Sequence, residues 1–235
     1  MYSRSRIKFN RRQQKADRLK MKPKAVIFDM DGVIFDSERA VYMEWKALSE
    51  KYGFRDLDIP YYKCIGTNVD ATRRTFQEFY GEDFPYDRYR EEESRNYHAK
   101  YDGGRLPLKP GIRELLETLK QQGYGIAVAS STRSEVVSNQ LRDAGLLSFF
   151  DVVIGGDLVT KSKPDPEIFL KAAAALNCPP EQAYVIEDSY NGIRAANAAG
   201  MIPVMVPDML APDEEMEQKA AYILKDLTAV REQLF

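Results

Sequence analysis

Five short apolar runs lie along the chain, and polar residues, glycine or proline stand at or directly after the end of each. They cover residues 24–29, 124–130, 151–154, 183–187 and 202–206. Runs of this length without helical spacing or strict alternation are typical of strands buried on both faces of a sheet. The pattern therefore predicts five buried strands.

Segments with helical spacing separate these strands, over residues 111–122, 135–144, 164–176 and 191–199. The first places four apolar side chains on one face, at Ile112, Leu115, Leu116 and Leu119. Ser134 is a candidate N-cap for the second, which is expected to end before a glycine. Because strands and helices alternate, we predict an α/β fold with a Rossmann-like, doubly wound parallel sheet as its core.

The alternation is interrupted once, from residue 38 to about 105, where only helical patterns occur. Apolar residues at helical spacing form one stripe, and further helical segments are expected near residues 69–79 and 86–101; the stripe comprises Val41, Trp45, Leu48 and Tyr52. We expect residues 38–105 to form a small α-helical cap domain inserted into a core of residues 23–37 and 106–235. Residues 36–38 and 105–110 would be its hinges.

Charge and composition exclude several classes of protein. The chain has 235 residues, one histidine and two cysteines, which argues against a multi-histidine zinc site and a disulfide framework. Residues 1–22 contain nine Lys or Arg and one Asp, and we interpret them as a basic, disordered extension. The remaining chain is acidic, so nucleic acid is not the expected ligand. No run is long and apolar enough for a membrane span or a secretory signal, so we expect a cytoplasmic protein. A monomer is the default expectation, because the sequence carries no sign of its oligomeric state.

Polar residues follow four of the predicted strands, where ligands bind in open parallel sheets. They are Asp29 and Asp31, Ser130 and Ser131, Lys163, and Glu187 and Asp188. Taken singly, each has an ordinary explanation as a turn residue, a helix cap or a solvated lysine. In combination they bring carboxylates, hydroxyls and an amine to one edge of the sheet.

This combination favours phosphoryl transfer. Crowded carboxylates repel one another and call for a cation, and oxygen ligands suit Mg²⁺. An amine and a hydroxyl can hold a phosphoryl group, one carboxylate can attack phosphorus, and a second acid can protonate the leaving oxygen.

The same residues lie in four ordered motifs that resemble those of haloacid dehalogenase-like hydrolases. The motifs are FDMDGVIFDSE at 28–38, ASST at 129–132, SKPDP at 162–166 and IEDSYNGI at 186–193. The resemblance covers about residues 24–207, and the helical insert is similar to the cap of the subgroup that contains β-phosphoglucomutase and phosphoglycolate phosphatase. It implies an enzyme that acts on a small phosphorylated metabolite such as a sugar phosphate.

The resemblance also assigns roles to the catalytic and phosphate-binding residues. It implies that Asp29 is the nucleophile and Asp31 the general acid and base. Ser130, Ser131 and Lys163 would bind the transferring phosphate.

A Mg²⁺ site is implied by the same motifs. Asp29, Asp188 and the backbone carbonyl of Asp31 would hold the ion, and Glu187 would join them directly or through water.

Hydrolysis is favoured over the mutase alternative, because mutases of this subgroup carry a histidine twelve residues after the nucleophile. This chain has Val41 there, and Val69 stands near the position of a phosphate-binding arginine. We therefore expect a Mg²⁺-dependent phosphatase. A β-phosphoglucomutase-type mutase is the alternative, and a pyrophosphatase or a receiver-like signalling domain is less favoured.

The sequence says least about the leaving group of the substrate. Polar cap residues at Thr67, Asn68, Arg73 and Arg95 are candidates for contacting it, although such arginines are more often solvated. The aromatic residues of the cap are interpreted as the interior of a helical bundle.

Overall fold

The computed structural model describes residues 23–65 and 69–235, so the basic extension and two cap candidates, Thr67 and Asn68, lie outside the described residues. Within the described part, six parallel strands form one sheet in the order β3-β2-β1-β4-β5-β6. They are β1 (Ala25–Phe28), β2 (Gly125–Ala129), β3 (Val152–Ile154), β4 (Ala183–Glu187), β5 (Ile202–Met205) and β6 (Tyr222–Ile223). The predicted doubly wound α/β core is thereby confirmed.

Strand β1 lies inside the sheet, between two strands that both come later in the chain. Ala25 pairs with Gly125 of β2 on one side and with Ala183 of β4 on the other. The chain order reverses between these neighbours, and such switch points open a crevice at the carboxyl ends of the strands. Asp29, directly after β1, stands at that crevice.

Helices cover both faces of the sheet, and alternate residues of β1 point to the two faces. Val26 and Phe28 pack with α6 (Ile112–Gln121), α7 (Ser134–Asp143) and α11 (Leu227–Leu234). Ala25 and Ile27 pack with α8 (Glu167–Ala175) and α9 (Tyr190–Ala198). Helix α10 (Glu214–Lys219) packs beside α9, and single turns of 3-10 helix occur at Leu147–Phe149, Gly156–Leu158 and Pro180–Gln182.

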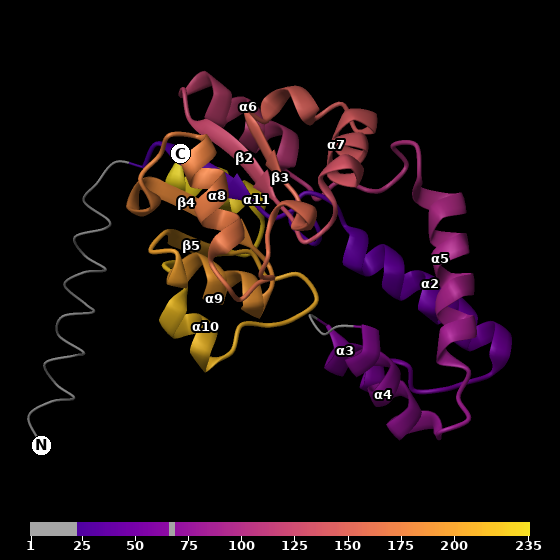
Figure 1. Cartoon of the computed structure of the whole chain (residues 1–235). Coiled ribbons are helices and arrows are strands. Elements are labelled where there is room, and N and C mark those ends of the chain that lie inside the picture. Colours follow the sequence, from indigo (N-terminus) through magenta and orange to yellow (C-terminus); the bar gives the residue numbers. More distant parts are fainter. Residues whose placement is uncertain (1–22, 66–68) are drawn as a thin grey trace, which may run out of the picture.

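The inserted segment forms four helices in the residues described. They are α2 (Ser37–Tyr52), α3 (Asp58–Cys64), α4 (Val69–Tyr80) and α5 (Tyr86–Tyr101), and they stand to one side of the sheet (Figure 1). Trp45 of the predicted stripe lies at their centre, where its ring stacks on Tyr86 with 5.5 Å between centroids. The four helices therefore have an apolar interior of their own, as expected for a cap.

The two chain segments that join this cap to the core run side by side. The backbone N–H of Asp36 donates to the carbonyl of Pro107, and that of Lys109 donates to the carbonyl of Ile34. The Lys109 ammonium binds Asp208 Oδ1 at 2.6 Å and Asp36 Oδ1 at 3.2 Å. The segments we expect to act as hinges are thus tied to each other.

One local prediction is wrong. Ser134 is the first residue of α7, not its N-cap, and its hydroxyl donates to Asp157 Oδ1 at 2.8 Å. The carboxylate of a distant loop competes for the hydroxyl that would otherwise cap the helix. None of the described helices combines the length and the apolar composition needed to cross a membrane.

Candidate active site

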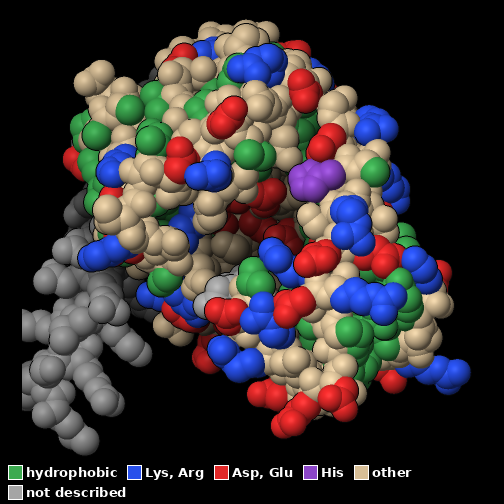
Figure 2. Space-filling view, turned by 45° about the vertical axis from the view of Figure 1, so that its right-hand side comes forward, with side chains coloured by type: hydrophobic (Ala, Val, Ile, Leu, Met, Phe, Trp, Pro, Cys, Tyr) green, Lys and Arg blue, Asp and Glu red, His purple; other side chains and the backbone are tan. Residues whose placement is uncertain are grey.

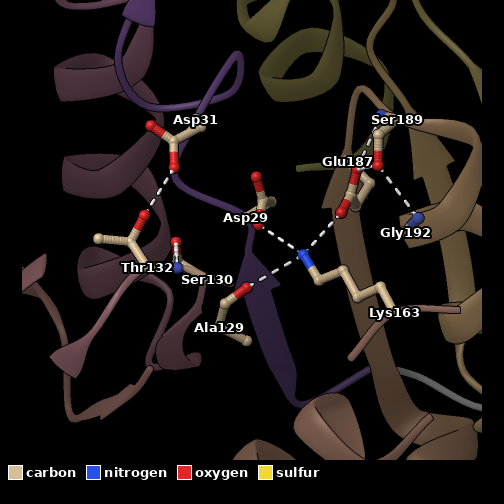
Figure 3. A network of polar contacts seen from close by, with 9 residues as sticks. All are labelled: Asp29, Asp31, Ala129, Ser130, Thr132, Lys163, Glu187, Ser189 and Gly192. Carbon is tan, nitrogen blue, oxygen red and sulfur yellow. Dashed lines mark hydrogen bonds and ion pairs between the residues drawn. The ribbon is translucent and has the colours of Figure 1, made fainter. Parts of the chain in front are cut away.

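Asp29 is buried at the end of β1 and bonded to Lys163. Asp29 is 7% exposed, and its Oδ1 accepts a hydrogen bond from Lys163 Nζ at 2.5 Å. The same ammonium donates to Glu187 Oε1 at 2.7 Å and to the carbonyl of Ala129 at 3.3 Å, as Figure 3 shows. Three strand ends and the loop after β3 thus meet at one amine.

Burial and charge act in opposite directions on this pair. Burial raises the pKa of Asp29, and the neighbouring carboxylates of Glu187 and Asp31 raise it further, while Lys163 opposes them. Burial alone would lower the pKa of Lys163, but Asp29 and Glu187 outweigh burial and hold that pKa above its ordinary value. Lys163 therefore stays charged and keeps Asp29 beside it ionisable.

Asp31 is held in place by two hydroxyl groups. Its Oδ1 accepts from Ser37 Oγ at 2.8 Å, and its Oδ2 accepts from Thr132 Oγ1 at 3.3 Å. Ser37 is the first residue of cap helix α2, and Thr132 follows β2, so the acid is positioned from both the cap and the core. Sequence reasoning gave no role to either hydroxyl, although both lie inside the quoted motifs.

Three carboxylates come close enough to share a cation. One oxygen each of Asp29, Glu187 and Asp188 lies within 4.8 Å of the others. The pKa of Asp188 is raised well above its ordinary value by burial, with the charges of Glu187 and Asp29 adding to the effect. A divalent cation would relieve this repulsion, so the donor set fits a hard metal ion such as Mg²⁺.

The three carboxylates differ in how far the protein already occupies them. Glu187 Oε2 accepts from the Ser189 backbone N–H at 2.8 Å and from its hydroxyl at 2.9 Å, while Lys163 occupies Oε1. Among the described residues, none donates a hydrogen bond to the carboxylate of Asp188 or to Oδ2 of Asp29. Asp29 and Asp188 therefore offer oxygens to a cation, and Glu187 is already held by the protein.

Two glycines allow the carboxylates to approach the backbone. Gly32 has φ +75°, and a Cβ there would overlap the carboxylate of Asp188. A Cβ on Gly192, in the first turn of α9, would overlap the carboxylate of Glu187. The motif glycines thus make room for the acidic cluster.

The two predicted phosphate-binding serines lie in different surroundings. Ser130 is fully buried, and its Oγ accepts from the Thr132 backbone N–H at 3.0 Å. Asp29 and Ser130 each follow the end of a paired strand, β1 and β2, which places Ser130 beside the nucleophile candidate (Figure 3). Ser131 is exposed, so only Ser130 is enclosed with Asp29.

The cap candidates that the structure describes are engaged elsewhere or exposed. Arg73 pairs with Asp87 at 2.8 Å and with Asp70 at 2.7 Å, so its guanidinium is occupied within the cap. Arg95 is exposed on α5, and its nearby charge helps to lower the pKa of Glu92. The contacts of Arg73 lie within the cap and Arg95 faces solvent, so a role for either in contacting the leaving group stays a prediction.

The surface is hollowed between core and cap, and acidic side chains gather at the bottom of the hollow (Figure 2). The arrangement combines a buried carboxylate with an unoccupied oxygen, a cationic amine and a second acid held at its side. Such a set can attack an electrophilic phosphorus, neutralise its oxygens and move a proton.

Known proteins share this fold and these motifs. A family profile described as haloacid dehalogenase-like hydrolase matches residues 26–206. The phosphorylated carbohydrates phosphatase of Thermotoga maritima is 34% identical over 187 residues, which span 75% of this chain and 82% of that protein. The β-phosphoglucomutase of Bacillus subtilis is 33% identical, over 78% of this chain and 83% of that protein.

A crystal structure of β-phosphoglucomutase from Clostridium difficile has a similar architecture. It superposes with a TM-score of 0.66 at 28% identity and covers 91% of this chain and 97% of its own. The chain belongs to the haloacid dehalogenase-like hydrolases, and the prediction of a phosphoric monoester hydrolase is confirmed.

Proposed function

We propose that the protein is a Mg²⁺-dependent phosphatase that hydrolyses a small sugar phosphate through an aspartyl-phosphate intermediate. The observation that carries the proposal is the pairing of Asp29 with Lys163, which leaves Asp29 Oδ2 unoccupied among the described residues while Asp31 is held nearby. The names of the two relatives, a phosphatase of phosphorylated carbohydrates and a β-phosphoglucomutase, support this substrate class.

In the first step, a carboxylate oxygen of Asp29 forms a bond to phosphorus while the bond to the leaving oxygen breaks. Asp31 gives its proton to that oxygen, so the leaving group departs as an alcohol. In the second step, Asp31 takes a proton from water, the water oxygen attacks phosphorus, and the bond to Asp29 breaks. Inorganic phosphate leaves, and both aspartates return to their starting states.

Lys163 and Ser130 would stabilise the charge that develops on the phosphoryl oxygens. Lys163 Nζ already lies 2.5 Å from Asp29 Oδ1, so its charge stands next to the position where phosphorus bonds. The Ser130 hydroxyl accepts one hydrogen bond from the backbone and keeps its own proton available for donation. Both donors are fixed before substrate arrives, which avoids reorganisation during the reaction.

Mg²⁺ would be held by Asp29, Asp188 and the backbone carbonyl of Asp31, with Glu187 contributing through the groups it orients. When bound, the ion supplies positive charge to the phosphoryl oxygens. Glu187, bonded to Lys163 and Ser189, fixes the amine in place.

The mutase alternative is favoured by the names of two similar proteins and opposed by two residues, Val41 and Val69. By the resemblance to this subgroup, a mutase would carry a histidine where this chain has Val41, which is partly buried against the cap interior. Valine can neither hold nor move a proton, so nothing at this position would favour transfer to a second sugar over transfer to water.

The experiment measures phosphate release from a panel of sugar phosphates and p-nitrophenyl phosphate, with and without Mg²⁺ after treatment with a chelator. Asp29→Asn should abolish release, whereas Asp83→Asn, an exposed position on the cap, should not change it. Substantial activity in Asp29→Asn would refute the covalent mechanism. Glucose 6-phosphate formed from β-glucose 1-phosphate and a bisphosphate primer, without free phosphate, would instead establish the mutase.

A further inference from the structure

The cap contains a pocket of about 210 Å³ enclosed by helices α2 to α5. Aromatic and charged side chains line it together, including Trp45, Tyr61, Tyr86, Glu38, Arg90 and Glu93. Aromatic walls with a few polar groups are typical of sites that bind small molecules.

Glu38, which lines the pocket, lies close enough to the candidate active site for the charge of Asp31 to act on it. Glu38 follows Ser37, whose hydroxyl holds the acid Asp31. Burial raises the pKa of Glu38 to about 7, and the charges of Asp31 and Asp208 add to this effect. A molecule whose phosphate lies at Asp29 could therefore extend its other end past Asp31 into this pocket.

Glu93 also lines the pocket, and no described residue bonds to its carboxyl group. The residue is 8% exposed, and its side chain has no hydrogen bond or ion pair with any residue that the structure describes. Two other cap glutamates show what a satisfied carboxylate looks like here. Glu44, which is 6% exposed, binds Lys100 at 2.9 Å, and Glu92 binds both Lys51 and Tyr52.

A buried carboxyl group without a partner is costly, and native proteins almost always satisfy such groups. The carboxyl group of Glu38, a half-buried residue, likewise accepts no hydrogen bond from the described residues. Tyr61 lies near both, since the charges of Glu38 and Glu93 each raise the pKa of its hydroxyl. Two acceptors that share one pocket and lack donors indicate a ligand that supplies donors.

We propose that this pocket binds the leaving group of the substrate, with Glu38 and Glu93 accepting hydrogen bonds from its hydroxyl groups. The inference rests on the proposed phosphatase function and narrows its substrate class to phosphate esters whose leaving group is uncharged and rich in hydroxyl groups. A second phosphate or a carboxylate on the leaving group is disfavoured, because two carboxylates face it and only one cation, the exposed Arg90, lines the described part of the pocket.

The test compares pairs of substrates that differ only in a hydroxymethyl or a carboxylate end. Glycerol 3-phosphate is paired with 3-phosphoglycerate, and sorbitol 6-phosphate with 6-phosphogluconate. The assays are run at about pH 8.5, where the carboxyl groups of the substrates and those of Glu38 and Glu93 are ionised. We expect kcat/KM to be about tenfold or more higher for the member that ends in a hydroxymethyl group than for the member that ends in a carboxylate. One contact between like charges is enough to produce a difference of this size.

Glu93→Gln is the diagnostic variant, because it keeps an acceptor and removes the charge. The variant should lower the preference for the hydroxymethyl member of each pair by about tenfold, mainly by raising kcat/KM for the carboxylate member. Glu91→Gln removes the same charge from an exposed position on the same helix and should leave the preference unchanged. A merely structural role for Glu93 would alter stability but not the ratio within a pair.

A binding measurement separates the pocket from the chemistry. Trp45 is the single tryptophan of the chain and forms part of the pocket wall, so its fluorescence can report occupancy in the Asp29→Asn protein. Sorbitol 6-phosphate should give a saturable change, and 6-phosphogluconate should need about tenfold more.

The outcomes of the two measurements are distinguishable. Turnover of p-nitrophenyl phosphate with equal or better use of the anionic members would overturn the pocket assignment and leave the phosphatase standing. No turnover of any compound would refute the phosphatase, and the fluorescence of Trp45 would then decide the pocket by itself. Equal binding of both members there would overturn it.

Discussion

Replacing Glu93 with glutamine should stabilise the cap, and the gain should depend on pH. Glu93 has a pKa of about 7 in the folded protein against an ordinary value of 4.5, chiefly because it is buried. Arg90 and His98 lower this pKa, and Glu44 raises it. Because the folded pKa is the higher one, protonation favours the folded state. This stabilisation is complete below about pH 4.5 and is lost as the pH rises through about 7.

The size of the effect follows from the shift. The difference between 7 and 4.5 is 2.5 pKa units, which at about 1.36 kcal/mol per unit gives an upper bound of about 3.4 kcal/mol. Since Glu93 faces a pocket that water can enter, we halve this bound to about 1.7 kcal/mol for screening. Glutamine never ionises, so it avoids this loss, and the melting temperature of Glu93→Gln should exceed that of the wild type by about 5 °C at about pH 8.5.

The assay is thermal unfolding followed by the fluorescence of Trp45, which is 4% exposed in the cap interior and therefore reports the cap. The gain should largely vanish at about pH 4.5, where the Glu93 carboxyl group of the folded protein, with its pKa of about 7, is protonated. Glu91→Gln serves as the control and should show little difference at either pH. An equal gain at both pH values, or a less stable variant at high pH, would refute an unpaired buried charge at Glu93.

Two further variants test the acid and the metal-ligand cluster. Asp31→Asn should lower kcat by at least about 100-fold for sugar phosphates but far less for p-nitrophenyl phosphate, whose leaving group needs no proton; equal losses would contradict the role of the acid. Gly32→Ala should lower stability by about 1–2 kcal/mol through its left-handed backbone and also lower phosphatase activity by more than about tenfold, because its Cβ meets Asp188. Gly53→Ala, at φ +74° with open space around it, should lower stability similarly and keep activity, and similar activities in the two variants would contradict the overlap.

The sheet could be predicted from the sequence because buried parallel strands are continuous apolar runs. The cap was harder. Helix α3 (Asp58–Cys64) was not predicted, since it has seven residues and a proline at its third position. Strand β6 was missed as well, because two residues at a sheet edge carry no periodic signal.

In the candidate site, too, the residues at strand ends could be predicted, and those that depend on side-chain packing could not. Asp29, Glu187 and Asp188 could be placed together because strand ends in a parallel sheet share one edge. The hydroxyls of Ser37 and Thr132 that hold Asp31 depend on side-chain directions that spacing does not encode. Glu93 was overlooked for a different reason: it stands in a highly charged stretch of helix that reads as a solvated face, and only packing against α2 and α4 buries it.

The central place of β1 has a consequence for how the chain assembles during synthesis. Its partners begin 100 and 158 residues later, since Ala25 pairs with Gly125 and Ala183. The described cap helices leave the ribosome before β2 or β4 has been synthesised. The cap can therefore fold through local contacts while both edges of β1 remain unpaired. An apolar strand in that state is prone to pair with other chains. We expect chaperone dependence to be greatest between the emergence of the cap and the arrival of β2.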